Sequence, residues 1–468
     1  MGSLNADAYA EKESFLTTST DCNSSDENVS LLGNVSIRPY PQAQEGRTSF
    51  PGAVFIIVNA CIGAGILNFP AAYAATGGPV AGVIVQLVLL LFIICSLLIL
   101  ALCADIKRSS TYQDVISSMC GKHGRICCEI CIILYCFGAC ITFLIVIGDQ
   151  TDLILQTFLP EDVAKQFWAK RQFMIFLLGT FILYPLCLPK KVDFLKYPSS
   201  VGVFATLYVC AVIILTYYLK KGTHTLHPTT HSDYSWTRGF AAVPTICFGF
   251  QCHLSSVPVY ASLKHRNVKH FSLIVLTAMS VSSVAYILSG TFGYLTFGFA
   301  VCPDILSTYS AKNAAISVAR VMILVNMLTT YPVLHYCGRL ALETMYKGFR
   351  GMAADDDDPH ERRRRAIETT SWFVLSLLLA MFLPNIQVVI SPIGGLAAVF
   401  IFVFPGLCFL QFIFKHSATS ERKRQYLIAA AIAFVAIGTF IFGTSVTQSV
   451  MDDISGQSLA QCVNEASP

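Results

Sequence analysis

Long apolar runs alternate with short polar segments along most of the chain. A helix needs about 20 apolar residues to cross the hydrocarbon core of a bilayer, and eleven runs approach or exceed that length. They span residues 52–74, 79–103, 127–148, 172–189, 199–219, 239–262, 271–299, 313–340, 369–384, 387–414 and 425–449. The ten-residue alternating segments typical of a membrane barrel do not occur. The pattern therefore predicts an all-α polytopic membrane protein with eleven transmembrane helices.

Two of these runs contain residues that interrupt a helix. The first run includes "NACIGAGILNFP" at 59–70, and the sixth includes "VPTICFGFQCHLSSVPVY" at 243–260. An interrupted membrane helix is tolerated where its freed backbone groups are buried in protein or line a cavity. Because the interruptions lie five runs apart, we expect two inverted repeats of five helices, with broken helices 1 and 6 and an added eleventh helix. Such a pair is a good sequence indication of a transporter binding site.

The interruption in the first run offers chemistry for a charged ligand. Gly63 and Gly65 carry no side chains, so another molecule can approach the backbone closely there. Together with Ala64 they place N–H groups at the start of a half-helix, where the positive end of the helix dipole suits a carboxylate. The carbonyls near Asn59 and Ile62 would accept a small cation. The alternative interpretation is a small-residue packing face between helices.

The interruption in the sixth run adds polar side chains. An ionisable residue within a membrane helix is a functional candidate, although His253 in a broken segment could instead satisfy local backbone groups. We expect Phe248, Gln251 and His253 to bind the substrate. A ligand bound there would meet freed carbonyls of helices 1 and 6 and would lie against helices 3, 6 and 8.

Composition and charge agree with this interpretation. The chain is 54% hydrophobic and 13% charged, with a mean hydropathy of +0.61, whereas a soluble protein is about a quarter charged. With the N-terminus inside, the inner loops carry twenty Lys and Arg residues and the outer loops seven, as the excess of positive charge on the cytoplasmic side requires. We expect a disordered cytoplasmic tail at 1–48, a transmembrane transporter domain at 49–450, and a lumenal or extracellular tail at 451–468.

Three further features lie outside the interruptions. Arg320, in the eighth run, must pair or face a cavity, and we expect it to pair with Glu129; the alternative is a place near the outer entrance. Cys302 and Cys462 fall on outer segments and could form a disulfide. The run "DDDDPHERRRR" at 355–365 reads as a solvated loop.

Motifs for enzyme catalysis are missing from the sequence. It contains no GxSxG, no HExxH and no glycine-rich loop followed by Lys-Ser or Lys-Thr. Without a phosphate-binding loop, ATP-driven transport is excluded as well. A channel, a receptor or a secondary transporter remains.

Four motifs, in order, resemble the sodium-coupled neutral amino acid transporters of the amino acid and auxin permease group. They are "VNACIGAGILNFP", "PTICFGFQCH", "LTTYPVLHYCGR" and "FIFVFPGLC". The resemblance extends over nearly all of 50–449. It implies sodium bound between helices 1 and 8, at Asn59, Ile62 and Thr330, with Thr329 as a neighbouring hydroxyl. It also implies symport of sodium with a neutral amino acid by alternating access, with sodium as coupling ion and no cofactor.

Shorter segments resemble a lysosomal member of this family that exports glutamine and asparagine. They are "TYQDV", "IGDQ" and "ERRRR". In the tail, "ENVSLL" places Glu27 four residues before Leu31 and Leu32, a pattern that sorting adaptors read as an acidic dileucine signal. We therefore expect the protein in the lysosomal membrane, with the plasma membrane as the alternative.

Two other functions stay open at this point. One is a proton-coupled amino acid transporter, in which His253 or a carboxylate titrates in place of a sodium site. The other is a transporter-like amino acid sensor that signals through residues 1–48. In both cases the interrupted helices would still bind the amino acid.

Overall fold

The computed structural model describes residues 48–164, 166–189, 196–220, 239–310, 313–351, 360–383, 386–415 and 421–455. In these ranges the chain is helical apart from turns, loops and one isolated β-bridge between Thr48 and Leu263. Nine helical segments in the described ranges are long and apolar enough to cross a membrane. Two shorter apolar helical segments, Phe50–Cys61 and Arg171–Cys187, lie at the first and fourth predicted spans. The all-α fold is therefore confirmed, whereas the count of eleven spans stays a prediction.

Most spans are single helices. These are α3 (Pro79–Lys107), α4 (Tyr112–Phe158), α8 (Lys196–Lys220), α11 (Val268–Phe297), α13 (Ala314–Arg350), α14 (Glu361–Phe382) and α17 (Glu421–Ser455). Two spans contain a π-helical turn between α-helical parts: α6 (Arg171–Leu178) with α7 (Tyr184–Cys187), and α15 (Gln387–Ala398) with α16 (Phe404–Lys415). Short helices α5 (Glu161–Ala164) and α12 (Ile305–Thr308) lie between spans.

The first and sixth spans are each divided in two, as predicted. The first consists of α1 (Phe50–Cys61), a 3₁₀ turn at Ala64–Leu67, and α2 (Phe69–Ala75). The sixth consists of α9 (Gly239–Gly249) and α10 (His253–Ala261). Pro70 opens α2, where its missing N–H costs no helical hydrogen bond.

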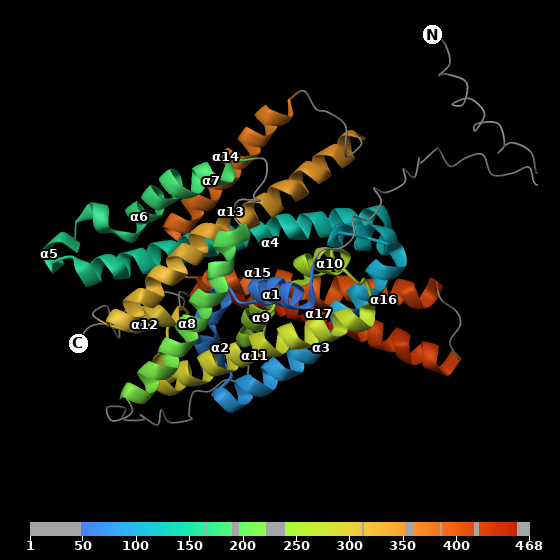
Figure 1. Ribbon diagram of the computed structural model, residues 1–468, viewed down its shortest axis with the longest axis horizontal. Coiled ribbons are helices and arrows are strands. Elements are labelled where there is room, and N and C mark those ends of the chain that lie inside the picture. Colours follow the sequence, from blue (N-terminus) through green and yellow to red (C-terminus); the bar gives the residue numbers. More distant parts are fainter. Residues whose placement is uncertain are drawn as a thin grey trace, which may run out of the picture. The chain divides into compact units, whose positions relative to one another are not determined.

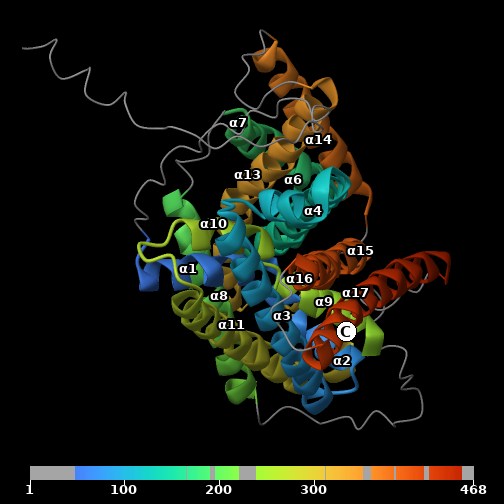
Figure 2. The same cartoon turned by 90° about the vertical axis from the view of Figure 1, so that its right-hand side faces the viewer.

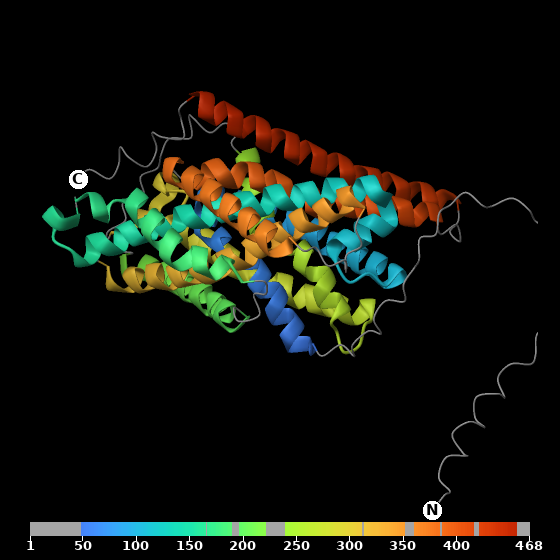
Figure 3. The same cartoon turned by 90° about the horizontal axis from the view of Figure 1, so that it is seen from above.

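The helices form two groups that meet along the broken segments. Figure 1 shows α4 and α13 running side by side, and α14 and α6 also pack on α4. Figure 2 shows these four helices together in its upper part, whereas α2, α3 and α11 lie together below them. Figure 3 shows α17 along one edge, where it contacts α15 and α16 and exposes Phe440 and Tyr426.

Two helices extend beyond the predicted apolar runs. α4 begins at Tyr112 rather than near residue 127, with a backbone kink at Gly121, whose φ is +78°. α14 begins at Glu361, so the last residues of the 355–365 segment are helical and not a loop, which corrects that prediction. A hydropathy pattern identifies only the part of a helix that lies in the bilayer. The backbone hydrogen bonds of the helix can continue through polar residues that lie in water.

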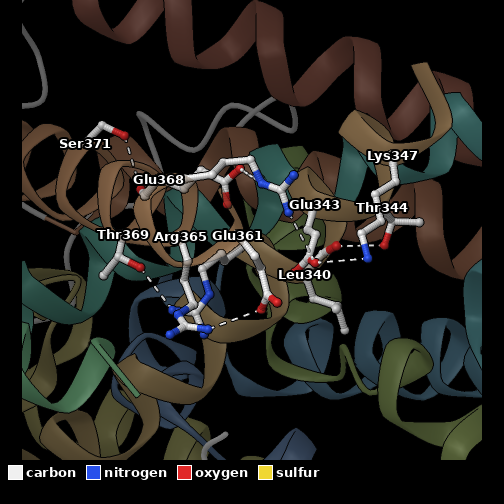
Figure 4. A network of polar contacts seen from close by, with 11 residues as sticks. Leu340, Glu343, Thr344, Lys347, Glu361, Arg365, Glu368, Thr369 and Ser371 are labelled. Atoms are coloured by element: carbon white, nitrogen blue, oxygen red, sulfur yellow. Dashed lines mark hydrogen bonds and ion pairs between the residues drawn. The ribbon is translucent and has the colours of Figure 1, made fainter. Parts of the chain in front are cut away.

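Charged pairs stabilise the polar start of α14. Glu361 accepts from Arg365 one turn later at 3.3 Å, and Glu343 of α13 lies 3.4 Å from Arg364 and 3.6 Å from Lys347 (Figure 4). Glu four residues before Arg is the favourable orientation for a helical pair. The arginine run therefore ties the ends of α13 and α14 together.

Candidate functional site

The backbone between α1 and α2 leaves the helical conformation at Ile62. Ile62 has φ −77° and ψ 93°, and Gly63 has φ −134° and ψ −141°. A 3₁₀ turn then begins at Ala64, and the first N–H groups of such a turn have no partner within it. The segment therefore presents a short helix start in the middle of a membrane span, as the sequence indicates.

The two interruptions touch each other through their backbones. A Cβ atom added at Gly65 would lie 2.9 Å from the Cα of Gly249, and one added at Gly249 would lie 2.6 Å from the ring of Phe69. By contrast, a Cβ atom at Gly63 would meet nothing within 4 Å among the described residues. Of the two glycines in the first break, Gly65 therefore packs against the second break, and Gly63 keeps open space beside it.

Helix α11 supplies hydrogen bonds to carbonyls that the interruptions free. The Tyr286 hydroxyl lies 2.7 Å from the Cys61 carbonyl oxygen and 2.8 Å from that of Gly249, so it reaches both breaks. Ser289 donates to the carbonyl of Ile66 at 3.3 Å. Tyr286 also stacks on Phe69, with ring centroids 3.9 Å apart. These contacts satisfy buried backbone groups that would otherwise be costly in a membrane.

The sequence reasoning did not identify Tyr286 or Ser289. A signal was present, because Ser282, Tyr286, Ser289 and Gly293 recur at intervals of four, three and four residues. That spacing places them on one face of a helix. A polar stripe of this kind in an apolar helix indicates a face turned toward polar groups rather than toward lipid.

His253 and Gln251 form a buried polar chain with α3. His253 is fully buried; its Nε2 lies 2.7 Å from the Ser96 hydroxyl, and its Nδ1 lies 3.1 Å from Gln251 Oε1. Gln251 is also buried, and its Nε2 has no hydrogen-bond partner in the described part of the chain. Because both nitrogens of the ring are engaged, a direct bond from His253 to a ligand would require one of these contacts to break.

Phe248 lies in the last turn of α9, directly before the sixth-helix break, and packs against Tyr135 of α4. Its ring centroid is 6.3 Å from that of Tyr135, and both side chains are buried. The pair brings the third and sixth spans together next to Gly249. The role of Phe248 in binding the substrate stays a prediction.

Four oxygen atoms of three residues gather on one turn of α13. The hydroxyls of Thr329 and Thr330 donate to the carbonyl of Asn326 at 3.0 and 2.8 Å. The Thr330 hydroxyl also lies 3.2 Å from Asn326 Oδ1. Such hydroxyl and carbonyl oxygens are hard ligands of the kind that suits a hard cation.

Helix α8 packs closely on this turn. A Cβ atom at Gly202 would lie 2.3 Å from Asn326 Oδ1. In the part of the chain that the structure describes, no hydrogen bond links Asn59 with Thr330. The structure therefore brings these oxygens of α13 together, and the sodium site between helices 1 and 8 stays a prediction.

The expected pair of Arg320 and Glu129 is wrong. Glu129 lies 2.9 Å from Arg125, one turn earlier on α4. Arg320 is fully buried and donates to the carbonyls of Leu306 and Tyr309 at 2.9 and 2.8 Å. Backbone carbonyls can take the place of a carboxylate when a loop folds over the guanidinium, and a hydropathy pattern does not reveal that loop.

Some expectations fall outside the described residues. They concern the tail residues Glu27, Leu31 and Leu32, and Cys462, the expected disulfide partner of Cys302. These remain predictions from the sequence.

Comparison with known proteins places the chain in a family. A family model described as transmembrane amino acid transporter protein matches residues 46–451. The human protein named sodium-coupled neutral amino acid transporter 7 is 44% identical over 414 residues, which cover 87% of this chain and 89% of that protein. The Xenopus laevis protein of the same name is 43% identical, with 92% and 96% covered. Human solute carrier family 38 member 8 is 36% identical, with 89% and 97% covered.

A solved structure supports the fold. The crystal structure of MhsT in complex with L-phenylalanine matches with a TM-score of 0.51 and 12% identity, and covers 86% of this chain and all of that one. At this identity the likeness concerns the fold alone, and it agrees with a 5+5 inverted-repeat arrangement built around broken helices 1 and 6. The family is one of transporters and not of enzymes. The match over nearly the whole chain, together with two broken helices joined by Tyr286, shows that this chain belongs to the transmembrane amino acid transporter family, among the sodium-coupled neutral amino acid transporters.

Proposed function

We propose that the chain is a secondary active transporter that moves neutral amino acids together with sodium by alternating access. The observation that carries this proposal is the direct contact of the two helix breaks at Gly65 and Gly249, with Tyr286 bonded to a carbonyl of each. A site built on two half-helix pairs offers N–H groups, carbonyls and a change of backbone shape in one place. The names of the relatives, which refer to sodium and neutral amino acids, support the same proposal.

The proposed substrates are glutamine and asparagine. The substrate carboxylate would bind the N–H groups at Gly63, Ala64 and Gly65, where open space beside Gly63 allows access. Gln251 is buried, and its amide nitrogen has no partner among the residues that the structure describes, so it would bond the side-chain amide of the substrate. His253 bonds Ser96 through one ring nitrogen and Gln251 through the other. It would therefore orient Gln251 rather than contact the substrate itself.

Competition between amino acids tests the substrate class. In vesicles containing the purified chain, unlabelled asparagine is expected to compete with labelled glutamine, and leucine and phenylalanine are expected to compete poorly. A buried polar group left unpaired by an apolar substrate costs binding energy. If leucine or phenylalanine displaces glutamine at lower concentration, the proposed substrate class is wrong.

Sodium would bind between helices 1 and 8. The α13 ligands would be the Thr329 and Thr330 hydroxyls and the Asn326 carbonyl, which already lie together. Helix 1 would contribute Asn59 and the carbonyl of Ile62, next to the point where α1 ends. Binding of sodium would then hold α1 against α13 and favour the shape that binds the amino acid.

Thr330→Ala is expected to raise the sodium concentration for half-maximal glutamine transport by about tenfold, because an oxygen ligand is worth on the order of 1–2 kcal/mol. Thr344→Ala is the matched control, since Thr344 makes the same bond to a carbonyl four residues earlier on the same helix, outside the proposed site. Sodium titration of the initial rate measures both. An unchanged sodium dependence in well-expressed Thr330→Ala would remove this residue from the site.

We also propose that the protein works in the lysosomal membrane and exports amino acid from the lumen to the cytosol. The support is the pattern of Glu27, Leu31 and Leu32 in the tail and the resemblance noted above. An extended segment can insert two leucines into an apolar pocket of a sorting adaptor. The plasma membrane is the alternative location.

The double variant Leu31→Ala, Leu32→Ala is expected to move a tagged protein from lysosomes to the cell surface. Light microscopy against a lysosomal marker and surface biotinylation measure the change. Leu16→Ala, in the same tail, is a control that should leave the location unchanged. A double variant that stays in lysosomes would show that this dileucine is not the signal, and a wild-type protein at the surface would contradict the proposed location.

A further inference from the structure

A buried carboxyl group lies in the segment that joins α11 to α13. Asp304 is 5% exposed and caps α12, accepting from the Leu306 N–H at 3.0 Å through Oδ1. Its other oxygen, Oδ2, accepts from Gln150 Nε2 of α4 at 2.5 Å. A single carboxyl group therefore connects this segment to the end of the long helix α4.

Charged groups of both signs surround Asp304. The positive charge of Arg320, on α13, lowers the pKa of Asp304 by electrostatic attraction, and its guanidinium also donates to a carbonyl of the same segment. The negative charge of Asp149, on α4, repels a negative charge on Asp304. Asp149 itself forms an ion pair with Arg171 of α6 at 2.5 Å. Asp152 interacts electrostatically with both Asp149 and Arg171. Among the described residues, Asp304 therefore has no cationic partner of its own that would keep it ionised.

The balance of these influences raises the pKa of Asp304 toward neutral pH. Burial raises the pKa of Asp304 to about 7, and the Asp149 carboxylate adds to that rise. The Leu306 N–H, the Gln150 amide and the Arg320 guanidinium act in the opposite direction and offset only part of it. Burial without full charge compensation disfavours the ionised form.

Gln150 can accommodate either protonation state. Its Nε2 donates to the carboxylate, and its Oε1 is buried without a hydrogen-bond partner among the described residues. If Asp304 is protonated, the amide can turn so that Oε1 accepts from the new O–H group, because an amide offers a donor on one side and an acceptor on the other. Gln150 Oε1 thus provides a hydrogen-bond acceptor for the O–H group of a protonated Asp304.

Gly293 of α11 lies between this segment and the outer half of the first broken helix. A Cβ atom at Gly293 of α11 would lie 2.6 Å from Ile305, next to Asp304, and 2.5 Å from Pro70 of α2. The Asp304 segment therefore packs beside α2 on one side and bonds α4 on the other. A movement that separates α2 from α4 at this end would expose Asp304 to water.

We propose that Asp304 and Gln150 form a proton-binding site, and that a proton bound there stabilises the closed arrangement of this end of the transporter. The inference rests on the proposed function in one respect, the assumption that this end opens and closes during transport. The ligand is the proton itself, taken from the aqueous phase on that side.

The direction of the pH effect follows from the two states. An exposed aspartate has a pKa near 3.9, and the buried one titrates at about 7. The closed arrangement therefore gains stability that is fully present below about pH 4 and is lost as the pH rises through about 7. An acidic outer compartment favours closure, and neutral pH favours opening.

Hydrogen exchange of residues 301–310 in the detergent-purified full chain tests the site without requiring transport. After correction for intrinsic rates, exchange in the wild type is expected to be about tenfold faster at pH 7.5 than at pH 5. Asp304→Asn, which cannot ionise, is expected to exchange slowly at both pH values. Asp162→Asn, at an exposed carboxyl group on α5, is the matched control and should behave as the wild type does.

A second variant keeps the test decisive if Asp304→Asn does not fold. Gln150→Leu removes the side chain that would bond the carboxyl group in either protonation state, so exchange at pH 5 is expected to rise above that of the wild type. The proposal is overturned if the wild type shows no pH dependence, if Asp304→Asn keeps that of the wild type, or if Gln150→Leu leaves exchange at pH 5 unchanged. A chain with pH-dependent exchange and no amino acid transport would contradict the proposed function and not the proton site.

Discussion

Gly65→Ala is expected to reduce glutamine transport at least about tenfold and to lower the thermal stability of the purified protein. The added methyl group would lie 2.9 Å from the Cα of Gly249, and a backbone atom cannot move aside as the end of a side chain can. Overpacking of this kind costs about 1–3 kcal/mol. The two breaks would be forced apart at the point where they meet, so the site between them would change shape. Labelled flux and thermal unfolding measure the two effects.

Two other glycines separate this effect from a general intolerance of alanine. Gly443→Ala on α17, where a Cβ atom would meet nothing within 4 Å among the described residues, should leave flux and stability unchanged. Gly63→Ala should fold as the wild type does, for the same reason, but should raise the KM for glutamine if the substrate carboxylate approaches there. Wild-type flux in Gly65→Ala would contradict the role given to the contact of the breaks.

Tyr286→Phe is expected to reduce transport by about tenfold while the protein still reaches the membrane. The change removes the hydroxyl that reaches the carbonyls of Cys61 and Gly249 and keeps the ring that stacks on Phe69. A buried carbonyl left without its donor costs about 1–3 kcal/mol. Both breaks would lose this hydrogen-bond donor. We therefore expect the KM for glutamine to rise and the maximal rate to fall.

Tyr218→Phe is the control for this substitution, because Tyr218 on α8 is 57% exposed and its hydroxyl is not part of the breaks. Transport kinetics and a melting curve are recorded for both variants. If Tyr286→Phe transports like Tyr218→Phe, the hydroxyl bridge between the two breaks has no functional role.

The sequence alone predicted where the breaks lie, because glycine, proline and polar residues in an apolar run carry local information. The first break was expected at 59–70, and helix α1 ends at Cys61 and α2 begins at Phe69. The sixth-helix break at Phe250–Cys252 falls inside the expected stretch in the same way. Local weakness of a helix is a property of neighbouring residues, so a single sequence reveals it.

The partners of those breaks could not be predicted in the same way. The bond from Tyr286 to Cys61 joins residues 225 positions apart, and the bond from His253 to Ser96 joins residues 157 positions apart. Which donor meets which freed carbonyl depends on how the helices pack, and hydropathy does not contain that information. For the same reason the sequence pairs Arg320 with Glu129, although Arg320 bonds two carbonyls of the segment that precedes α13.

The most direct test of the central claim is labelled-glutamine uptake into vesicles that contain only the purified chain. With sodium outside and none inside, uptake is expected to exceed that in sodium-free vesicles several-fold, and to depend on sodium even when no pH difference is present. Uptake that ignores sodium and follows an imposed pH gradient would instead indicate a proton-coupled transporter. No uptake under either gradient, with glutamine still bound by the purified chain, would contradict transport and leave a sensor.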